Sequence, residues 1–264
     1  MSAALILSAM LHAGAALAWW LWPQGWPWWL ALVLGNHAVL FAAGCMPRSR
    51  LLGPNRTRLS SSAAARGEIA LTFDDGPDPE VTPKVLDLLD AHGARASFFC
   101  IGERAAAHPA LVREIVARGH RVENHSARHP MWFGFYGPMR MAREIALAQA
   151  WLTAAAGVAP RYFRAPMGIR NPLLAPVLAH LGLGYVSWSR RGFDAVTHDA
   201  ERVFERIARG LRAGDIVLLH DGPTPYAGLR SAGAPAVLTV LPRLLSLLAE
   251  RQWRAVSLPD PDHD

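Results

Sequence analysis

From residue 68 onward, short apolar segments typical of β-strands alternate with longer amphipathic segments typical of α-helices. The seven expected strands are 68–73, 95–101, 120–124, 161–164, 184–188, 214–219 and 252–256. The expected helices are 81–92, 104–118, 138–156, 172–181, 200–212 and 236–250. Such alternation favours a parallel sheet with right-handed crossovers, because each helix returns the chain to the same end of the sheet. We therefore expect an α/β fold, a distorted (β/α)7-type barrel, with a doubly wound open sheet as the alternative.

Two uncharged apolar segments, 3–22 and 27–45, precede this alternating region and are joined by a short turn. Each has the length of about 20 residues that crosses the roughly 30 Å hydrocarbon core of a bilayer. Six of the ten tryptophans lie between Trp19 and Trp29, beside the turn, as in an interfacial aromatic belt. We therefore expect a two-helix N-terminal transmembrane hairpin.

Two other interpretations of these apolar segments are open. The sequence ALA at 16–18 resembles a signal-peptidase site, although no basic residue precedes the first segment and a second apolar segment follows at once. A soluble, buried helical hairpin is the other interpretation, because Asn36 and His37 lie in the middle of the second segment.

The arginines suggest an orientation for a membrane hairpin. Arg48, Arg50, Arg56 and Arg58 follow the second segment, whereas the turn and the N-terminus carry no basic side chain. The positive-inside rule then places both ends in the cytoplasm. The expected localisation is a bacterial-type inner membrane with two N-terminal spans, the following domain on the cytoplasmic side and the lipid bilayer as a partner.

The chain divides into four expected parts: the hairpin at 1–46, a turn-rich linker at 47–66, an α/β domain at 67–258 and a tail at 259–264. A chain of 264 residues has room for one core of roughly 200 residues plus an appendage. Its formal charge is +6, and all of its basic residues except Lys84 are arginines. Such a chain could contact anionic lipid headgroups or a phosphate-bearing substrate, because arginine forms bidentate contacts with phosphate. Because no run of five or more like charges occurs, we expect no nucleic-acid partner. The oligomeric state does not follow from the sequence.

Polar side chains that could carry out chemistry follow the expected strands. They are Asp74 and Asp75 after the first strand, His125 and His129 after the third, Arg164 at the end of the fourth, Asp194 after the fifth and His220 at the end of the sixth. In a β/α barrel the loops after the strands form one rim, where active sites are built. The order of the strands is therefore expected to bring these side chains together.

His125 and His129 are spaced as i and i+4, which in a helical turn places both rings on one face, as paired metal ligands require. Together with Asp75 they form a three-ligand set with open positions, which is the catalytic arrangement. Imidazole and carboxylate ligands suit zinc, and other divalent ions are compatible with them. A cation on Asp75 would offset the repulsion between adjacent carboxylates and leave Asp74 ionised as the base for a metal-bound water.

Three further residues fit this division of roles. Arg164 would hold Asp74 in place, His220 would be the general acid that protonates a leaving amine, and Asp194 would orient His220 and favour its imidazolium form. The alternatives are a structural ion pair for Arg164, a histidine that caps a core strand for His220 and a surface acid for Asp194.

At these residues the chain resembles the polysaccharide deacetylase family, metal-dependent hydrolases related to chitooligosaccharide deacetylases that share a NodB-homology domain. The matching segments are TFDDGP at 72–77, HSARH at 125–129, RAPMG at 164–168 and LLH at 218–220. The resemblance covers roughly residues 66–256. It implies a distorted β/α barrel that removes N-acetyl or related acyl groups from amino sugars.

The resemblance also implies a role for each site residue. Asp74 would be the base; Asp75, His125 and His129 would hold the metal; Arg164 would position Asp74; His220 would be the acid. The backbone N–H of Met167 would stabilise the oxyanion.

The fourth family segment departs from its usual pattern. Members often show W-S-x-D-x-x-D-W, whereas WSRRGFDA at 188–195 has Arg191 for the first Asp and Ala195 for the last Trp. Asp194 is retained as the residue expected to tune His220. The chemistry therefore transfers by resemblance, and the chitin-like sugar specificity does not.

We expect a hydrolase of linear amide bonds that removes an N-acyl group, with N-acetyl as the first expectation, from an amino sugar of a glycan or lipid-linked saccharide. One alternative is a deformylase of a lipid-linked amino sugar or a hydrolase of another linear amide. The other is a non-catalytic, membrane-anchored protein that binds glycan.

Overall fold

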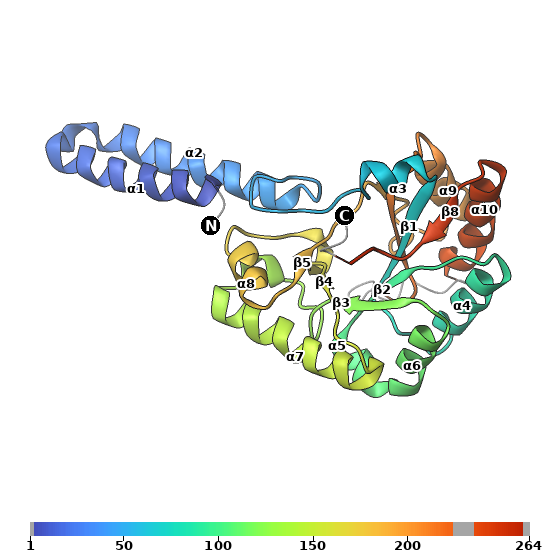
Figure 1. Cartoon of the computed structure of the whole chain (residues 1–264). Helices are drawn as coiled ribbons and strands as arrows, with labels where there is room; N and C mark the ends of the chain where they lie inside the picture. The colour runs from blue at the N-terminus through green and yellow to red at the C-terminus, as the bar shows by residue number, and fades with distance from the viewer. Residues whose placement is uncertain (1–2, 224–234, 261–264) are drawn as a thin grey trace.

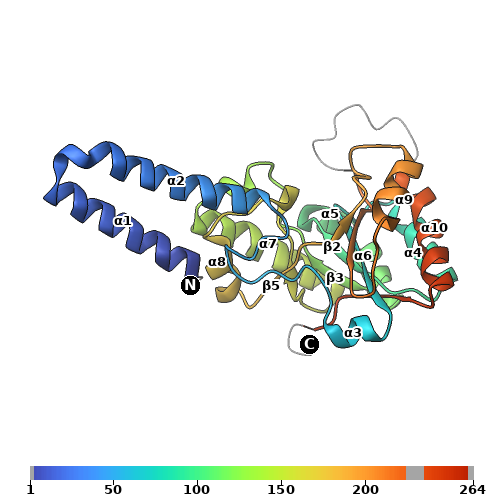
Figure 2. The ribbon, with the colours of Figure 1, turned by 90° about the horizontal axis from the view of Figure 1, so that it is seen from above.

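The computed structural model describes residues 3–223 and 235–260 of the 264-residue chain. An N-terminal helical hairpin projects from one side of an α/β domain (Figure 1). A view at right angles shows the same projection, beside helices α7 (Pro138–Ala156) and α8 (Leu174–His180) of the domain (Figure 2). The last four residues of the expected tail, 261–264, lie outside the described residues.

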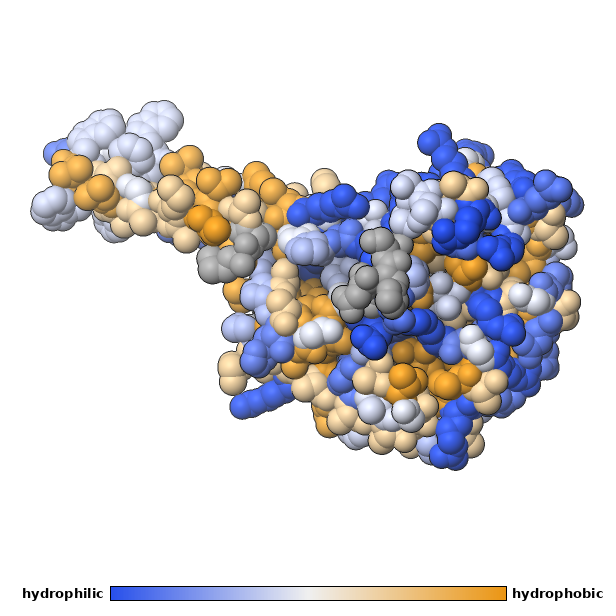
Figure 3. Space-filling view, in the orientation of Figure 1, coloured by the Kyte–Doolittle hydropathy of each residue, from blue (hydrophilic) through white to orange (hydrophobic). Residues whose placement is uncertain are grey.

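The hairpin consists of α1 (Ala3–Leu21) and α2 (Trp26–Cys45), joined by the 3-10 turn η1 (Pro23–Gly25). Both helices are long and apolar enough to cross a membrane, and only 6% and 11% of their apolar windows are buried. Their surface is mostly apolar or weakly polar, in contrast to the hydrophilic side chains that cover much of the visible face of the domain (Figure 3). This exposure argues against the alternative in which the hairpin is buried in a soluble core.

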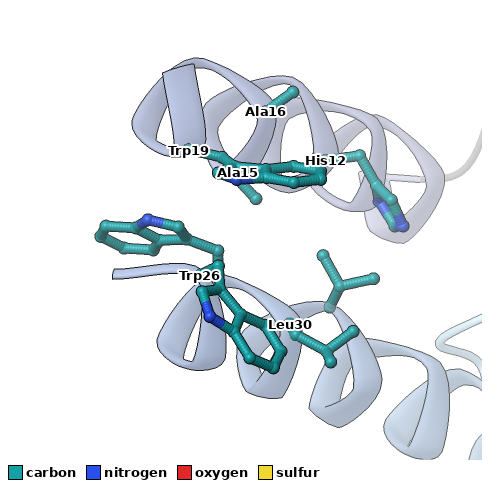
Figure 4. Close-up of a pocket in the computed structure, with 8 residues that line it drawn as sticks. His12, Ala15, Ala16, Trp19, Trp26 and Leu30 are labelled. Atoms are coloured by element: carbon teal, nitrogen blue, oxygen red, sulfur yellow. The ribbon is translucent and has the colours of Figure 1, made fainter. Parts of the chain in front are cut away.

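Two polar contacts join the helices of the hairpin. The side-chain amide of Asn36 donates to the hydroxyl of Ser8 at 2.8 Å, and the Nε2 atoms of His12 and His37 lie 3.3 Å apart. Nearer the turn a groove of about 340 Å³ lies between the helices, and Trp19 and Trp26 lie across it on opposite helices (Figure 4). The tryptophans therefore gather at the end of the hairpin that is far from the domain.

The domain is built on a curled parallel sheet. Its strands are β1 (Glu68–Asp74), β2 (Ser97–Cys100), β3 (Arg121–Asn124), β4 (Tyr162–Phe163), β5 (Gly184–Tyr185), β6 (Arg190–Arg191), β7 (Ile216–His220) and β8 (Arg254–Val256). The order is β5-β4-β3-β2-β1-β7-β6, with β8 paired to the start of β1. The fold confirms the expected distorted, barrel-type α/β architecture, and each of the seven expected strands overlaps a strand of the sheet. The two-residue β6 is additional.

Helices cover the outside of this sheet (Figure 1). Besides α7 and α8, they are α3 (Ser61–Ala65), α4 (Thr82–Ala91), α5 (Gly102–Ala107), α6 (Pro109–Ala117), α9 (Ala200–Ala208) and α10 (Ala236–Glu250), with 3-10 turns η2 (Phe133–Phe135) and η3 (Pro166–Gly168). The single helix expected at 104–118 is wrong: the chain breaks at His108 into α5 and α6. Proline cannot continue a helix from the preceding turn but is favoured at the first helical position, so Pro109 ends one helix and begins the next.

The central strand β1 is buried on both faces after its first residue. Ile69, Leu71 and Phe73 point outward into the main apolar core beneath the helices. Because side chains alternate along a strand, Thr72 and Asp74 point to the opposite, inner side. The last residue of β1 therefore carries its carboxylate to the inner rim of the sheet.

The segment 47–66, expected as a linker, runs along the domain and is packed against it. Leu52 and Leu59 are buried. Arg56 pairs with Val186 as an isolated bridge, and Arg58 makes an ion pair with the buried Asp215. The hairpin is thus joined to the domain by an ordered stretch of chain.

The end of the hairpin also contacts the domain directly. The backbone N–H of Arg170 donates to the carbonyl of Gly44 at 3.2 Å, and the rings of Phe41 and Phe135 lie 6.2 Å apart. A Cβ atom at Gly44 would lie 2.2 Å from the Arg170 carbonyl oxygen, so this contact requires glycine. The last turn of α2 therefore rests on the segment that follows RAPMG.

Candidate active site

A pocket of about 130 Å³ lies where β1, β3, β4 and β7 end. It has room for about four water molecules, each of which takes about 30 Å³. Six of the residues singled out in the sequence line it: Asp74, Asp75, His125, His129, Met167 and His220. The other two, Arg164 and Asp194, lie behind this lining, where they contact Asp74 and His220. The rim of the sheet thus brings all eight together.

Asp75, His125 and His129 offer ligand atoms that all lie within 4.8 Å of one another, and all three side chains are buried. Asp75 Oδ1 lies 3.4 Å from His125 Nε2 and 3.3 Å from His129 Nε2. His125 Nδ1 lies 2.9 Å from the carbonyl oxygen of Arg164. Because a carbonyl can only accept, Nδ1 carries the proton, and in the neutral ring Nε2 presents its lone pair to the cluster.

The charge states of the other two residues agree with a cation site. Burial, followed by the charge of His125, lowers the pKa of His129 to about 4, which keeps its ring neutral at neutral pH. Burial by itself would raise the pKa of Asp75, but the neighbouring His125, His220 and His129 outweigh it and hold this pKa below its usual range. Two imidazoles and one carboxylate are a donor set that suits a divalent cation, zinc among others.

The two histidines converge in a way that their spacing does not explain. Residues 125–130 form a loop, so the helical turn expected from the i and i+4 spacing is wrong. Instead, Ser126 and His129 adopt left-handed backbone conformations, with φ of 67° and 52°. The backbone N–H of Ser126 donates to Asn124 Oδ1, and that of His129 donates to Ser126 Oγ. These bonds stabilise a conformation that is uncommon for residues with a Cβ atom.

Asp75 and Met167 have left-handed backbones as well, with φ of 73° and 59°. At Asp75 this conformation interrupts the alternation of β1, so that two adjacent carboxylates line the same pocket. Met167 lies in η3. The last residue of this turn, Gly168, lies so close to Trp188 that a Cβ atom on Gly168 would be 2.5 Å from the indole. Left-handed residues are concentrated at functional sites, and four of the six non-glycine examples in the described chain lie here.

Asp74 is held by a fully buried arginine. Arg164 Nη1 donates to Asp74 Oδ1 at 2.5 Å and to Thr72 Oγ1 at 3.0 Å, and Nη2 donates to the carbonyl of Ser187. The guanidinium also lies 4.0 Å from the centre of the Phe99 ring. A buried charge pair is costly unless its remaining groups are satisfied. One carboxylate oxygen of Asp74 is thus fixed by Arg164, and Oδ2 lies 3.8 Å from His125 Nε2.

His220 and Asp194 form the second paired unit of the site. Asp194 accepts from the backbone N–H of His220 at 2.7 Å through Oδ2, and its Oδ1 lies 3.0 Å from His220 Nδ1. Burial alone would lower the pKa of His220, but the charge and hydrogen bond of Asp194, aided by Asp75 and Asp74, raise it to about 9. His220 is therefore an imidazolium at neutral pH in this arrangement.

Several residues of the site were not assigned from the sequence. Trp188, Arg191, Ala195 and Val196 line the pocket from the side of the departing fourth segment. WSRRGFDA departs visibly from the family pattern, but the two-residue strand that carries Arg191 to the pocket is too short to leave a sequence pattern.

Asp221 is a further residue that sequence reasoning passed over, although it follows His220 in LLHDG. It is buried, its Oδ2 accepts from Thr82 Oγ1 at 2.6 Å, and its backbone N–H donates to the carbonyl of Asp74 at 3.2 Å. Burial raises the pKa of Asp221 to about 7. It ties the end of β7 to the end of β1 and to the start of α4.

The polysaccharide deacetylase family model matches residues 62–186, which contain three of the four matching segments and end before WSRRGFDA. The chain is 35% identical over 201 residues to the chitooligosaccharide deacetylase of Sinorhizobium fredii, covering 75% of this chain and 93% of that protein. It is 34% identical over 182 residues to a peptidoglycan-N-acetylglucosamine deacetylase of Bacillus cereus, covering 67% and 81% of the two chains.

A solved structure is similar in both fold and sequence. It is a family 4 carbohydrate esterase from Streptomyces lividans in complex with acetate, with a TM-score of 0.63 and 33% identity, and the match covers 72% of this chain and 91% of that one.

Replacement of Asp194 tests the electrostatics of the second pair. A folded-state pKa above the ordinary value of about 6.5 means that protonation of His220 stabilises the fold below that value, a contribution lost as the pH rises through about 9. In Asp194→Asn the carboxylate charge is gone, so we expect the pKa of His220 to fall to about 6.5 or lower. The measurement is an NMR pH titration of the imidazole in chelator-treated protein. Asp199→Asn, at the exposed start of α9, is the matched control, and an unchanged pKa in Asp194→Asn would contradict the assignment.

Proposed function

The chain belongs to the polysaccharide deacetylase family of hydrolases, and we propose that it removes an N-acetyl group from an amino sugar of a glycan or lipid-linked saccharide. Its expected class, a hydrolase of linear carbon–nitrogen bonds, is that of the family. The observation that carries the proposal is the convergence, in one buried pocket, of the Asp75–His125–His129 cluster with the Asp74–Arg164 and His220–Asp194 pairs. We assign residues 67–258 as the catalytic domain.

Asp75, His125 and His129 would hold a divalent cation, and the donor set favours zinc. Such a cation supplies Lewis acidity, which polarises the amide carbonyl and lowers the pKa of a water molecule. The hydrogen bond from His125 Nδ1 to the Arg164 carbonyl fixes the ring so that Nε2 faces the cluster.

Asp74 takes the proton from the attacking water. Arg164 fixes one of its oxygens and leaves the other beside His125 on the pocket lining. A general base must be within hydrogen-bond reach of the proton that it removes, and a carboxylate at the pocket wall meets this requirement. The buried guanidinium also keeps the carboxylate from rotating out of position.

The other two steps use the opposite side of the pocket. His220 donates a proton to the leaving amine: Nδ1–H is held by Asp194, and the second N–H of the imidazolium remains for the substrate. The backbone N–H of Met167 stabilises the negative charge that develops on the carbonyl oxygen. The left-handed conformation of Met167 sets the direction of this peptide group in advance.

The size of the pocket supports a small acyl group. Its volume of about 130 Å³ is well below the roughly 300–1,000 Å³ of pockets that enclose whole ligands. The pocket therefore takes the acylamino group, while the sugar lies on the rim, where Met167, Phe193 and Val196 are exposed.

We further infer that residues 1–46 anchor the enzyme in a membrane, with 47–66 as the connection to the catalytic domain. The apolar, exposed surface of the hairpin and its outer tryptophans support this inference. A groove of about 430 Å³ lies between Leu40 and Phe41 of the hairpin and Phe135, Ile169 and Leu173 of the loops that follow HSARH and RAPMG. An apolar groove between the anchor and these catalytic loops favours a substrate that is linked to lipid.

Replacement of single site residues separates metal binding from proton transfer. We expect Asp75→Asn and His129→Ala to lose bound metal and turnover together, because each removes a ligand. Asp74→Asn should keep its metal and lose turnover by about 100-fold or more, the typical contribution of a general base. Metal content by elemental analysis, beside acetate release, checks both statements. Full activity of His129→Ala without metal would contradict the mechanism.

The acyl group is decided by product analysis. Purified full-length enzyme is incubated with N-acetylated and N-formylated amino sugars, free and lipid-linked, and the products are identified by mass spectrometry. We expect acetate release from an N-acetylated sugar. Formate release alone would favour the deformylase alternative, and release from neither, with metal bound, would contradict the proposed hydrolysis.

The anchor and its orientation can be tested with the native cysteines. Cys45 is exposed at the end of α2, whereas Cys100 is fully buried, so a maleimide reagent should label Cys45 alone. We expect the protein in the membrane fraction, with Cys45 labelled by a membrane-impermeant maleimide only after the inner membrane is opened. Cys45→Ser is the control. Labelling before the membrane is opened would show that Cys45 faces the other side of the membrane. A shortened soluble protein would indicate a cleaved signal.

A further inference from the structure

Arg191 lies on β6, whose backbone pairs it with Leu218 of β7, two residues before His220. Both Arg191 and Leu218 line the active-site pocket. The short strand thus delivers a guanidinium to the wall of the pocket beside the proposed general acid. The catalytic steps described above do not use this side chain.

The carboxylates around Arg191 are engaged elsewhere. Asp74 is bound to Arg164, and Asp194 is bound to His220. The adjacent Arg190 points to Asp215, with its Nε 3.2 Å from the carboxylate. Within residues 3–223 and 235–260, no carboxylate lies within ion-pair distance of the Arg191 guanidinium, and its buried Nε has no hydrogen-bond partner. A cation at a half-buried position without a counter-charge carries a desolvation cost, and an incoming anion removes that cost.

Two aromatic rings prepare the guanidinium for such a ligand. Its carbon lies 5.1 Å from the centre of the Trp188 ring and 4.2 Å from that of Phe193. Aromatic contacts of this kind occupy the faces of a guanidinium and leave the N–H groups at its edge, the arrangement that binds carboxylate or phosphate in a bidentate manner. Burial lowers the pKa of Arg191, against the opposing effect of Asp194 and Asp74, and arginine remains charged at neutral pH.

We propose that Arg191 forms an anion subsite of the active-site pocket, so that the preferred substrate carries a carboxylate or phosphate group close to its acylamino group. This inference rests on the proposed deacetylation and names the substrate class of the same site. A neutral chitin-like chain leaves the guanidinium without a counter-charge. An acidic amino sugar or a sugar phosphate supplies one.

Three N-acetylated substrates distinguish the sources of the anion: chitotetraose, which is neutral; the disaccharide of N-acetylglucosamine and N-acetylmuramic acid, which carries a carboxylate; and N-acetylglucosamine 1-phosphate. Acetate release gives kcat and KM for each. We expect the full-length enzyme to have a KM about 10- to 100-fold lower for at least one anionic substrate than for chitotetraose, as hydrogen bonds to charged groups provide. The anion with the lower KM identifies the group that the subsite takes.

Arg191 variants then separate a substrate contact from a structural role. Arg191→Gln should raise the KM for the anionic substrate about 10- to 100-fold and leave that for chitotetraose unchanged, whereas Arg191→Lys should restore part of the difference. Arg206→Gln is the matched control, because Arg206 lies 5.4 Å from the same Phe193 ring but is exposed and outside the pocket lining. Its kinetic constants should match those of the unaltered enzyme.

The anion subsite is overturned if KM is the same for neutral and anionic substrates. It is also overturned if Arg191→Gln raises KM equally for all three substrates. Either result leaves the proposed deacetylation unaffected. Hydrolysis of none of the three counts against the deacetylation. In that case calorimetric binding of the same saccharides to the unaltered protein and to Arg191→Gln decides the subsite. Tighter binding of an anionic saccharide that Arg191→Gln abolishes supports it, and equal binding overturns it.

Discussion

The site depends on Arg164, a fully buried arginine that serves two groups at once. Its guanidinium fixes Asp74, and its main-chain carbonyl accepts from His125 Nδ1. The orientation of the proposed base and of one proposed metal ligand therefore follows from the placement of a single residue. Thr72 and Ser187 accept further hydrogen bonds from the guanidinium, and the Phe99 ring lies against it. Buried ion pairs add little net stability on average. The main effect of this pair is therefore to orient Asp74 rather than to stabilise the fold.

Charge is distributed in this pocket by pairing. Asp74 is paired with Arg164 and Asp194 with His220, whereas Asp75 faces the imidazoles of His125 and His129. Adjacent aspartates can thus lie in one pocket, because the groups that face them differ. Arg191 has no such partner among the described residues, and it lies beyond the segment that the family model matches.

Much of the site could be predicted because strand ends are readable in a sequence and parallel topology gathers them at one rim. That argument predicts the placement of Asp74, His125, Arg164 and His220. The rest depends on conformations with no sequence period. The left-handed backbones at Ser126 and His129 bring the histidines together without a helix, and the two-residue β6 is too short to leave a pattern. The break at His108 differs, because Pro109 is visible in the sequence and proline favours the first position of a helix. The contact of Gly44 with Arg170 joins two distant segments that share no pattern at all.

Through that contact the hairpin packs directly against the domain. Gly44 allows the last turn of α2 to lie directly on the carbonyl of Arg170, only three residues beyond Met167. Segments in such close contact transmit displacement, since no compressible layer of side chains separates them. The end of α2 and the segment after RAPMG therefore form one rigid unit, so that the tilt of the hairpin and the position of this segment are set together.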